Sequence, residues 1–436
     1  MAAVDVLTNG REDANAGLHR VLWSSMLGTA VEWYDFLIYG VATALVFNKL
    51  FFSSGSASAA SIASFGTLAV GYLARPLGAI IFGHFGDRVG RKAMLVLTIS
   101  IMGLGTFLIG ALPTLDQIGV AAPILLVALR FLQGIGLGGE WGGAVLMVVE
   151  NAPRGKRGFL ASIVQIGNPI GNLVAVGVFR LVSQLPEADF LSWGWRLPFL
   201  VSIVMVGIAL FIRAGLEETA SFRKVQATNR IIERPFMEII TKHPGNFFTA
   251  VALKTSEIAY ANIAGVFVIS YATANLKIPR DTVLNGVLLS SLLALVAMPA
   301  FGWLSDRIGR RAMFLASCAF SAAFAFPLFS LLATREPLKV VIAIVLAIVF
   351  GQMVMFSVGA AWYCELFPAR MRYTGASLGF QVGAALSGGL SPLIAASLVA
   401  WSGGPTWPVS IFLIACASIT ATAAWIAPET SSSDLD

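Results

Sequence analysis

The chain has 436 residues, of which 57% are hydrophobic and only 12% are charged. A soluble globular domain carries about 25% charged residues, so this composition excludes an ordinary soluble protein. In a soluble chain the net charge of +6 would suggest a nucleic-acid partner. Basic residues also gather in the cytoplasmic loops of membrane proteins, and we therefore expect no nucleic-acid partner.

Twelve apolar runs follow one another along the chain, separated by charged residues, Pro and Gly. Each run is long enough for a membrane-spanning helix of about 20 residues. The runs cover residues 21–47, 59–83, 93–112, 122–147, 158–181, 194–213, 246–274, 283–303, 312–333, 338–363, 373–400 and 405–427. They are continuously apolar rather than alternating, which excludes the strands of a β-barrel. The sequence predicts an all-α polytopic membrane protein with twelve transmembrane helices.

The long hydrophilic stretch between the sixth and seventh runs divides the chain into two similar parts. We expect a cytoplasmic tail at 1–20, a six-helix bundle at 21–213, a cytoplasmic linker at 214–245, a second six-helix bundle at 246–427 and a tail at 428–436. Most Lys and Arg residues fall in cytoplasmic segments if both termini are cytoplasmic. We therefore predict this orientation, in a cell (inner or plasma) membrane.

Two signatures recur in the same order in the two predicted bundles. Residues 83–92 read GHFGDRVGRK and follow the second run, and residues 302–311 read GWLSDRIGRR and follow the eighth. A second signature follows the fourth run, with Glu150 and Arg157, and the tenth run, with Glu365 and Arg372. Two signatures at nearly equal offsets indicate a duplicated six-helix unit.

These repeated loops predict a gate that closes the cytoplasmic side. Glycine lets two helix ends approach closely, and an Asp near a helix N-terminus can also pair with Arg. The alternative for any single copy is an ordinary basic turn. The predicted gate residues are Asp87, Arg88, Arg91, Asp306, Arg307, Arg310, Glu150, Arg157, Glu365 and Arg372.

GHFGDRVGRK and GWLSDRIGRR resemble the loop signature of the major facilitator superfamily, and the resemblance covers residues 20–428. Further stretches resemble the metabolite:proton symporter family within it. They are GTAVEWYDFLIY (28–39), ARPLGAIIFGHFGD (74–87), RFLQGIGLGGEWGG (130–143), ENAPRGKRG (150–158) and WGWRLP (193–198). GGEWGG together with QIGNPIG (165–171) is most similar to the shikimate-type branch.

The resemblance implies the major facilitator fold of two six-helix bundles, a central cavity and uptake coupled to protons. It implies a small organic acid as substrate, such as shikimate, 2-oxoglutarate or a related carboxylate. We expect the proton gradient to drive this symport without a cofactor, and the chain to work as a monomer in the lipid bilayer.

Charged residues inside predicted spans are the candidates for proton coupling, because a charge in the membrane is costly and usually functional. Glu32 and Asp35 in the first span are three positions apart, as are Lys254 and Glu257 in the seventh. This spacing puts each pair on one helix face. We expect Asp35, Glu32 and Glu257 to exchange the proton. The alternative is a permanent ion pair that holds helices together.

A carboxylate substrate needs a cation in the cavity, and three predicted spans supply one. Arg130 offers a planar fork, Lys254 a point charge, and Arg75 is the third. The alternatives are a structural bond from Arg130 to a carboxylate such as Glu32, and a pair between Lys254 and Glu257. Polar and aromatic residues complete the predicted substrate site, although each could instead serve helix packing. They are Gln133, Trp141, Gln165 and Tyr260.

Three other functions remain as alternatives. Uptake of a zwitterionic osmolyte such as proline or betaine is disfavoured by the short C-terminal tail, since one osmosensing branch of the family has a long coiled-coil tail. Export of drugs or metabolites is disfavoured because Asn168-Pro169-Ile170-Gly171 departs from the exporter signature in span five. An integral-membrane enzyme is disfavoured because the three histidines lie at loops or span edges. We expect no metal site, since the three cysteines lack ligand spacing.

Overall fold

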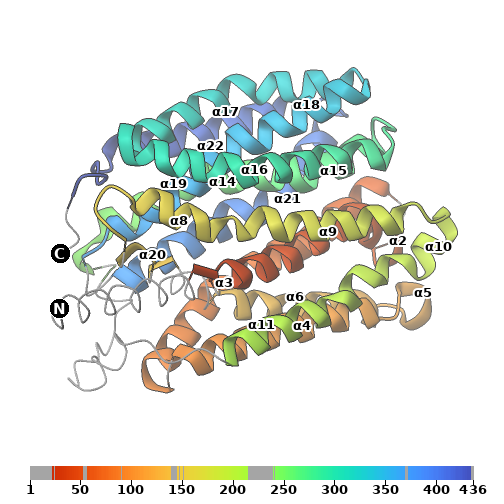
Figure 1. The fold of residues 1–436 in the computed structure, drawn as a ribbon. Coiled ribbons are helices and arrows are strands. Elements are labelled where there is room, and N and C mark those ends of the chain that lie inside the picture. Colours follow the sequence, from red (N-terminus) through yellow and green to blue (C-terminus); the bar gives the residue numbers. More distant parts are fainter. Residues whose placement is uncertain are drawn as a thin grey trace, which may run out of the picture.

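The computed structural model describes residues 22–23, 25–52, 56–89, 91–138, 145–146, 148–150, 152–214, 239, 241–368 and 372–433. These residues form helices that run side by side along one direction (Figure 1). Within the described residues, ten helices are long and apolar enough to cross a membrane, and two shorter apolar helices lie at 96–111 and 194–208. Together they match the twelve predicted spans.

The first six spans, called the N-terminal helices below, end at Ala214. In chain order they are the helix Ser25–Leu50, which contains η1 (Thr43–Phe47) and α2 (Asn48–Leu50), then α3 (Ala57–Val89), α4 (Arg91–Ala111), α6 (Ala121–Gly138), α8 (Arg157–Gln165) with α9 (Gly167–Ser183), and α11 (Leu197–Ala214). The short helices α5 (Leu115–Ile118), α10 (Glu187–Ser192) and η2 (Gly194–Arg196) lie in the connections.

The last six spans, called the C-terminal helices below, begin at Pro244. They are α14 (Pro244–Asn262) with η3 (Ile263–Phe267) and α15 (Val268–Ala274), α16 (Arg280–Ile308), α17 (Arg310–Ala333), α18 (Pro337–Ile348) with η4 (Val349–Met353) and α19 (Val354–Glu365), α20 (Arg372–Gly383) with η6 (Ala384–Gly389) and α21 (Leu390–Trp401), and α22 (Trp407–Ile426). Most of the predicted linker, residues 215–238 and 240, lies outside the described residues.

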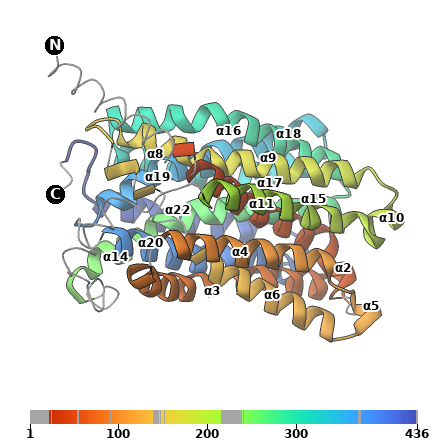
Figure 2. The ribbon, with the colours of Figure 1, turned by 60° about the horizontal axis from the view of Figure 1, so that its bottom comes forward.

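The two sets of helices meet along two seams. At one seam α8 and α9 pack against α16, and α8 also packs against α19. At the other, α3 packs against α20, η6 and α21. Figures 1 and 2 show α9 and α16 side by side from two directions. A site on these seams is therefore shared by both sets of helices.

The surface of the helices is apolar and charged groups lie inside, the reverse of a soluble protein. Large apolar side chains such as Phe211, Val296 and Trp425 are at least 70% exposed. Such a surface would aggregate in water, whereas lipid tails solvate it without cost. The fold therefore agrees with the composition.

Two glycine features bring helices together at one end of the molecule. Gly309 alone separates α16 from α17 and has φ of 100°, a conformation that favours glycine. The second copy of the repeated signature therefore lies on two helix ends and not in an open loop. Gly158 of α8 faces Gly302 of α16, and a Cβ on Gly158 would lie 2.7 Å from the Gly302 carbonyl oxygen.

In the part of the chain that the structure describes, four spans contain a π-helical segment: η1, η3, η4 and η6. Such segments widen the helix by one residue and frequently occur at functional sites. They release backbone groups that only neighbouring helices can satisfy, so they depend on tertiary packing. No local sequence pattern predicted them.

Candidate functional site

Among the described residues, six charged side chains are buried within the spans, away from the latch residues at the helix ends described below. They are Glu32, Asp35, Arg75, Arg130, Lys254 and Glu257, and none is more than 6% exposed. The first four belong to the N-terminal helices and the last two to α14 of the C-terminal helices. Three cations and three carboxylates balance in charge. Unpaired charges at such positions would be costly, so this balance makes the cluster tolerable in the membrane.

Arg130 on α6 is held by an aromatic ring and one side-chain amide. Its guanidinium carbon lies 4.0 Å from the centre of the Tyr39 ring, and Nη1 donates to Gln133 Oε1 at 3.2 Å. Gln133 in turn donates to Thr106 Oγ1 at 2.7 Å. Nε and Nη2 of Arg130 have no hydrogen-bond partner among the described residues. A fixed guanidinium with unused donors is suited to binding an anion.

The space for Arg130 comes from a glycine on the neighbouring helix. A Cβ on Gly71 of α3 would lie 2.4 Å from Arg130 Nε. Because α3 and α6 are adjacent, any larger residue at position 71 would displace the guanidinium.

Arg75 on α3 lies at the seam between the two sets of helices. Its guanidinium carbon is 4.2 Å from the centre of the Tyr72 ring. The Tyr72 hydroxyl accepts a hydrogen bond from Asn262 Nδ2 of α14 at 3.0 Å. This contact connects the environment of Arg75 to the C-terminal helices.

Lys254 and Glu257 form a buried ion pair one turn apart on α14. Lys254 Nζ also lies 3.7 Å from the centre of the Phe380 ring. The second carboxylate oxygen of Glu257, Oε1, has no hydrogen-bond partner among the described residues. The pair predicted as the alternative for Lys254 is thus present, with one carboxylate oxygen unused.

The two carboxylates of the first span face the cations of both sets of helices. Asp35 acts electrostatically on Arg130, and Glu32 acts on Lys254. Lys254 is also influenced by Arg75 across the seam. The six charges therefore form one electrostatic cluster shared by both sets of helices.

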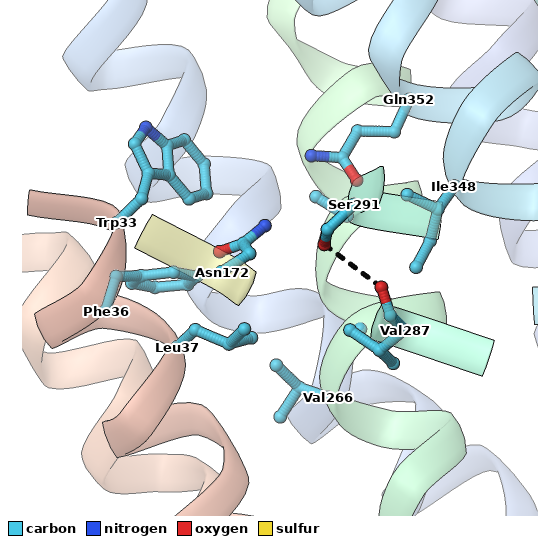
Figure 3. Close-up of a pocket in the computed structure, with 11 residues that line it drawn as sticks. Trp33, Phe36, Leu37, Asn172, Val266, Val287, Ser291, Ile348 and Gln352 are labelled. Atoms are coloured by element: carbon cyan, nitrogen blue, oxygen red, sulfur yellow. Dashed lines mark hydrogen bonds between the residues drawn. The ribbon is translucent and has the colours of Figure 1, made fainter. Parts of the chain in front are cut away.

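A narrow pocket lies beside this cluster, between the two sets of helices (Figure 3). The N-terminal helices contribute Trp33, Phe36, Leu37 and Asn172, and the remaining lining residues are Ala261, Gly265, Val266, Val287, Ser291, Ile348 and Gln352 of the C-terminal helices. Gly265 and Val266 belong to η3 and Gln352 to η4, so two π-helical segments shape the pocket. Its free volume is about 20 Å³, room for one water molecule.

A polar stripe on the fifth span leads to this pocket. Gln165, Asn168 and Asn172 lie three and four positions apart, at and after the break between α8 and α9. Asn172 Nδ2 donates to Asn168 Oδ1 at 3.2 Å, and neither amide atom of Gln165 has a partner among the described residues. Pro169 lacks a backbone N–H, which explains why the helix is interrupted one turn earlier.

The remaining predicted substrate residues fall elsewhere. The Tyr260 hydroxyl donates to the carbonyl oxygen of Ser321 on α17, within the C-terminal helices. The hydroxyl of Tyr260 is therefore engaged within the C-terminal helices. Trp141 lies outside the described residues.

Several predicted gate residues meet at one end of the two seams. The Asp306 carboxylate accepts hydrogen bonds from the backbone N–H groups of Gly158 and Phe159, both at 2.9 Å. It thereby caps the start of α8 from the opposite set of helices. Arg310 binds Asp306 at 2.8 Å and Glu365 at 3.2 Å. We call Asp306, Arg310 and Glu365, with the start of α8, the inner latch, after the cytoplasmic side on which the sequence predicts these residues.

A second ion pair lies at the same end. Arg372 Nη1 is 3.5 Å from Glu150 Oε1, so the two copies of the second signature are connected to each other. Arg307 points elsewhere, with its guanidinium carbon 3.9 Å from the Trp303 ring centre. The side chains of Asp87, Arg88 and Arg91 lie outside the described residues.

The C-terminal segment 427–433 lies across the inner latch, a feature the sequence analysis missed. Glu429 accepts hydrogen bonds from the backbone N–H groups of Arg310 and Arg311, both at 3.0 Å. Burial raises the pKa of the Glu429 carboxyl, but these N–H donors outweigh it and leave the pKa below its usual value.

The same segment then reaches the N-terminal helices. The carbonyl oxygen of Ser432 accepts from Arg154 at 2.5 Å, and that of Ser433 accepts from Arg157 at 2.7 Å. In the sequence, this contact is indicated only by an acidic residue after the last span, together with the basic residues of the repeated signatures elsewhere in the chain.

The opposite end is closed by a second ion cluster that the sequence analysis also missed. Glu187 of α10 pairs with Lys49 at 2.7 Å and with Arg280, the first residue of α16. The Arg280 guanidinium also lies 4.8 Å from the Phe190 ring centre. We call these residues the outer clasp. The inner latch and the outer clasp therefore bridge the two sets of helices at both ends, with the narrow pocket between them.

Comparisons with known proteins agree with this architecture. Residues 21–234 match the family described as "Sugar (and other) transporter", and residues 245–435 match "Major Facilitator Superfamily". The chain is 43% identical over 406 residues to the shikimate transporter of Escherichia coli (strain K12), with 92% of each chain covered. It is 35% identical over 404 residues to the proline/betaine transporter of the same strain, covering 88% of this chain and 78% of that one.

Two solved structures share the fold. The crystal structure of a D-xylose-proton symporter matches with a TM-score of 0.72 and 18% identity, covering 96% of this chain and 99% of the other. The Escherichia coli xylose transporter in a partially occluded inward-open conformation matches with a TM-score of 0.73 and 16% identity, over the same shares. At such identity the likeness concerns the fold, and it confirms the predicted twelve-helix architecture.

Proposed function

Because the chain belongs to the major facilitator superfamily, we propose that it is a secondary transporter that takes up a small organic carboxylate together with protons, by alternating access. The observation that carries this proposal is the buried cluster of three cations and three carboxylates on both sides of the seam. A carrier of an anion needs such cations, and a carrier coupled to protons needs buried carboxylates.

The balance of the cluster supplies a reason for coupling. A proton on Asp35, Glu32 or Glu257 leaves three cations facing two carboxylates. The cluster then has a net positive charge, which favours an entering carboxylate. When the proton leaves, the site is neutral again and the anion loses this attraction. Substrate and proton therefore stabilise each other in the cavity, which is the thermodynamic requirement for symport.

Individual residues take different parts in this proposal. Arg130 binds the substrate carboxylate, because it is fixed by Tyr39 and Gln133 and retains unused donors. Lys254 is released to the substrate when its partner Glu257 is protonated. Asp35 acts electrostatically on Arg130. After the anion leaves, the ionised Asp35 carboxylate balances the charge of the Arg130 guanidinium.

The two bundles, at 21–213 and 246–427, rock around this cluster. The inner latch and the predicted gate residues hold the cytoplasmic side closed, and the outer clasp holds the other side. Since the cluster and both closures belong to one chain, we propose that the monomer is the working unit, in a cell membrane with both termini in the cytoplasm.

Uptake by proteoliposomes tests the proposal directly. Labelled shikimate is offered with and without an inward proton gradient, with an unlabelled panel of carboxylates and betaines as competitors. We expect uptake that the gradient stimulates and carboxylates inhibit. Asp35→Asn should abolish accumulation against a gradient while retaining exchange between internal and external substrate. Normal accumulation by Asp35→Asn would remove Asp35 from the coupling step.

The same panel tests the alternatives. The relative named as a proline/betaine transporter raises a zwitterionic osmolyte as the second candidate. Inhibition by betaine or proline without inhibition by carboxylates would establish that candidate and make Arg130 and Lys254 structural. Loss of preloaded substrate that an inward proton gradient stimulates, without stimulated uptake, would instead indicate export.

A further inference from the structure

The pocket next to the charge cluster has polar groups without partners. We propose that it binds the hydroxyl groups of the substrate, so that the transported acid is a hydroxylated carboxylate. The inference rests on the proposed function, since it assumes that the substrate carboxylate occupies the neighbouring cations. In this proposal the uncharged amides of Asn172 and Gln352 bind substrate by hydrogen bonds, independently of the charged residues.

Asn172 and Gln352 face each other from opposite sets of helices. Figure 3 shows their amides extending into the pocket, Asn172 from α9 and Gln352 from η4. They are only 9% and 4% exposed. Asn172 Oδ1 is buried and has no hydrogen-bond partner among the described residues. Buried polar groups are nearly always paired in native proteins, so this oxygen awaits a partner that the substrate supplies, and the Gln352 amide lines the same pocket.

The chemistry of the pocket selects a neutral, hydroxyl-bearing group. A carboxamide offers both a donor and an acceptor, and a hydroxyl group matches both. The Ser291 hydroxyl, which donates to the Val287 carbonyl oxygen at 3.0 Å, keeps its lone pairs for a further donor. No charged residue lines the pocket, so a carboxylate gains no counter-charge there. The carboxylate and hydroxyl ends of a substrate thus have separate sites.

A positively charged substrate group is disfavoured by the same neighbours. Phe36 lines the pocket, and its ring centre already lies 5.6 Å from the Arg75 guanidinium carbon and 5.9 Å from that of Arg130. A quaternary amine placed on this ring would meet two like charges. The pocket therefore favours a hydroxy acid over a betaine.

An aromatic wall connects the pocket to the charge cluster. Trp33 packs edge to face against Phe36 at 5.4 Å and against Phe356 at 5.3 Å. Lys254 Nζ lies 5.1 Å from the Phe356 ring centre on the other side. The pocket as it stands has room for one water molecule. When the two sets of helices separate, the pocket widens and one substrate reaches both sites.

Two shape-conserving variants test the inference, Asn172→Leu and Gln352→Met, which remove the amides and retain volume. Gln184→Met, at an exposed position after α9, is the matched control. The probes in proteoliposomes are labelled shikimate and cyclohex-1-ene carboxylate, which lacks the hydroxyl groups. Each variant should raise the half-saturation concentration for shikimate about tenfold, the effect expected for an unpaired hydrogen-bonding group. Inhibition by cyclohex-1-ene carboxylate should change less than about twofold, since it makes no such bond.

Each other outcome contradicts a specific statement. Equal weakening of both probes would mean that the amides only pack the helices, and unchanged shikimate affinity would mean that they do not touch substrate. Both results overturn the hydroxyl site and leave proton-coupled carboxylate uptake standing. If neither acid is transported or inhibits transport in the unaltered protein, the proposed function falls and this inference falls with it.

Discussion

At the scale of single residues, the site depends on how each cation is held. Arg130 rests on Tyr39 and keeps two nitrogen atoms without partners, whereas Lys254 is already paired with Glu257. The residue types and positions of these charges could be read from the sequence, because a charge in an apolar run is conspicuous. The pair of Lys254 with Glu257 could also be read as an alternative, because both lie on one helix face. The contact of Arg130 with Tyr39 could not, since it joins helices that are far apart in the chain.

Arg130→Lys tests whether the guanidinium binds substrate. Lys keeps the charge but presents one ammonium group in place of a planar fork. We expect the half-saturation concentration for the transported carboxylate to rise about tenfold to a hundredfold, as expected for losing hydrogen bonds to a charged group. Transport kinetics in proteoliposomes measure this, and Arg335→Lys, on the exposed connection between α17 and α18, is the control. An unchanged half-saturation concentration would make Arg130 structural.

At the scale of elements, the twelve spans could be predicted because apolar length alone determines a transmembrane helix. The π-helical segments could not, because a π turn is stabilised by the packing of neighbouring helices rather than by local sequence. η3 and η4 shape the pocket, so this part of the site became visible only in the structure. The repeated signatures correctly indicated a contact region, but they did not show that Asp306 caps α8 of the other half.

The contact between Gly158 and Gly302 belongs to this scale. Gly158→Ala would place a methyl group 2.7 Å from the Gly302 carbonyl oxygen and force α8 away from α16. Overpacking of this kind costs about 1–3 kcal/mol, so the closed form of this end should lose population about tenfold or more. A cysteine introduced at Phe159 should then react faster with a membrane-impermeant thiol reagent on inside-out vesicles.

Gly177→Ala is the matched control, because a Cβ there would have no atom within 4 Å. It should leave the reaction rate unchanged. Equal rates in Gly158→Ala and the unaltered protein would show that the helix crossing does not govern closure.

At the scale of the whole molecule, closure has different chemistry at the two ends. The inner latch is buried, with Asp306, Arg310 and Glu365 at most 3% exposed, whereas Glu187 of the outer clasp is about half exposed. Exposed ion pairs are weak and screened by salt, while buried ones are not. The segment 427–433 adds a further bridge at the inner end only. The partners that join the two sets of helices could not be predicted, since Asp306 with Gly158, Glu187 with Arg280, and the tail with its helix ends are far apart in the chain.

Glu429→Gln tests the C-terminal bridge. The change removes the charge that caps α17 and should weaken the inner closure by about 1 kcal/mol. The pKa of Glu429 is lowered in the folded protein, so its contribution is complete above the ordinary carboxyl pKa and is lost only as pH falls through the lowered value. The ratio of uptake by the variant to uptake by the unaltered protein should therefore stay constant from about pH 5.5 to about pH 8.

Initial rates of uptake across this range provide the measurement. Glu336→Gln, on an exposed connection between α17 and α18, is the control and should leave the rates unchanged. A ratio that changes within the range would assign part of the pH dependence of transport to Glu429.

The buried charges also have a consequence for biogenesis. Among the described residues, the N-terminal helices contain two carboxylates and two guanidinium groups of the cluster, and the C-terminal helices contain one Lys and one Glu. The part of the described cluster that lies in each half is thus electrically neutral by itself. During synthesis the first half leaves the ribosome and enters the bilayer before the second exists. Because the cluster charges of the first half are balanced within that half, it can insert into the bilayer before the second half is made without leaving a cluster charge uncompensated in lipid.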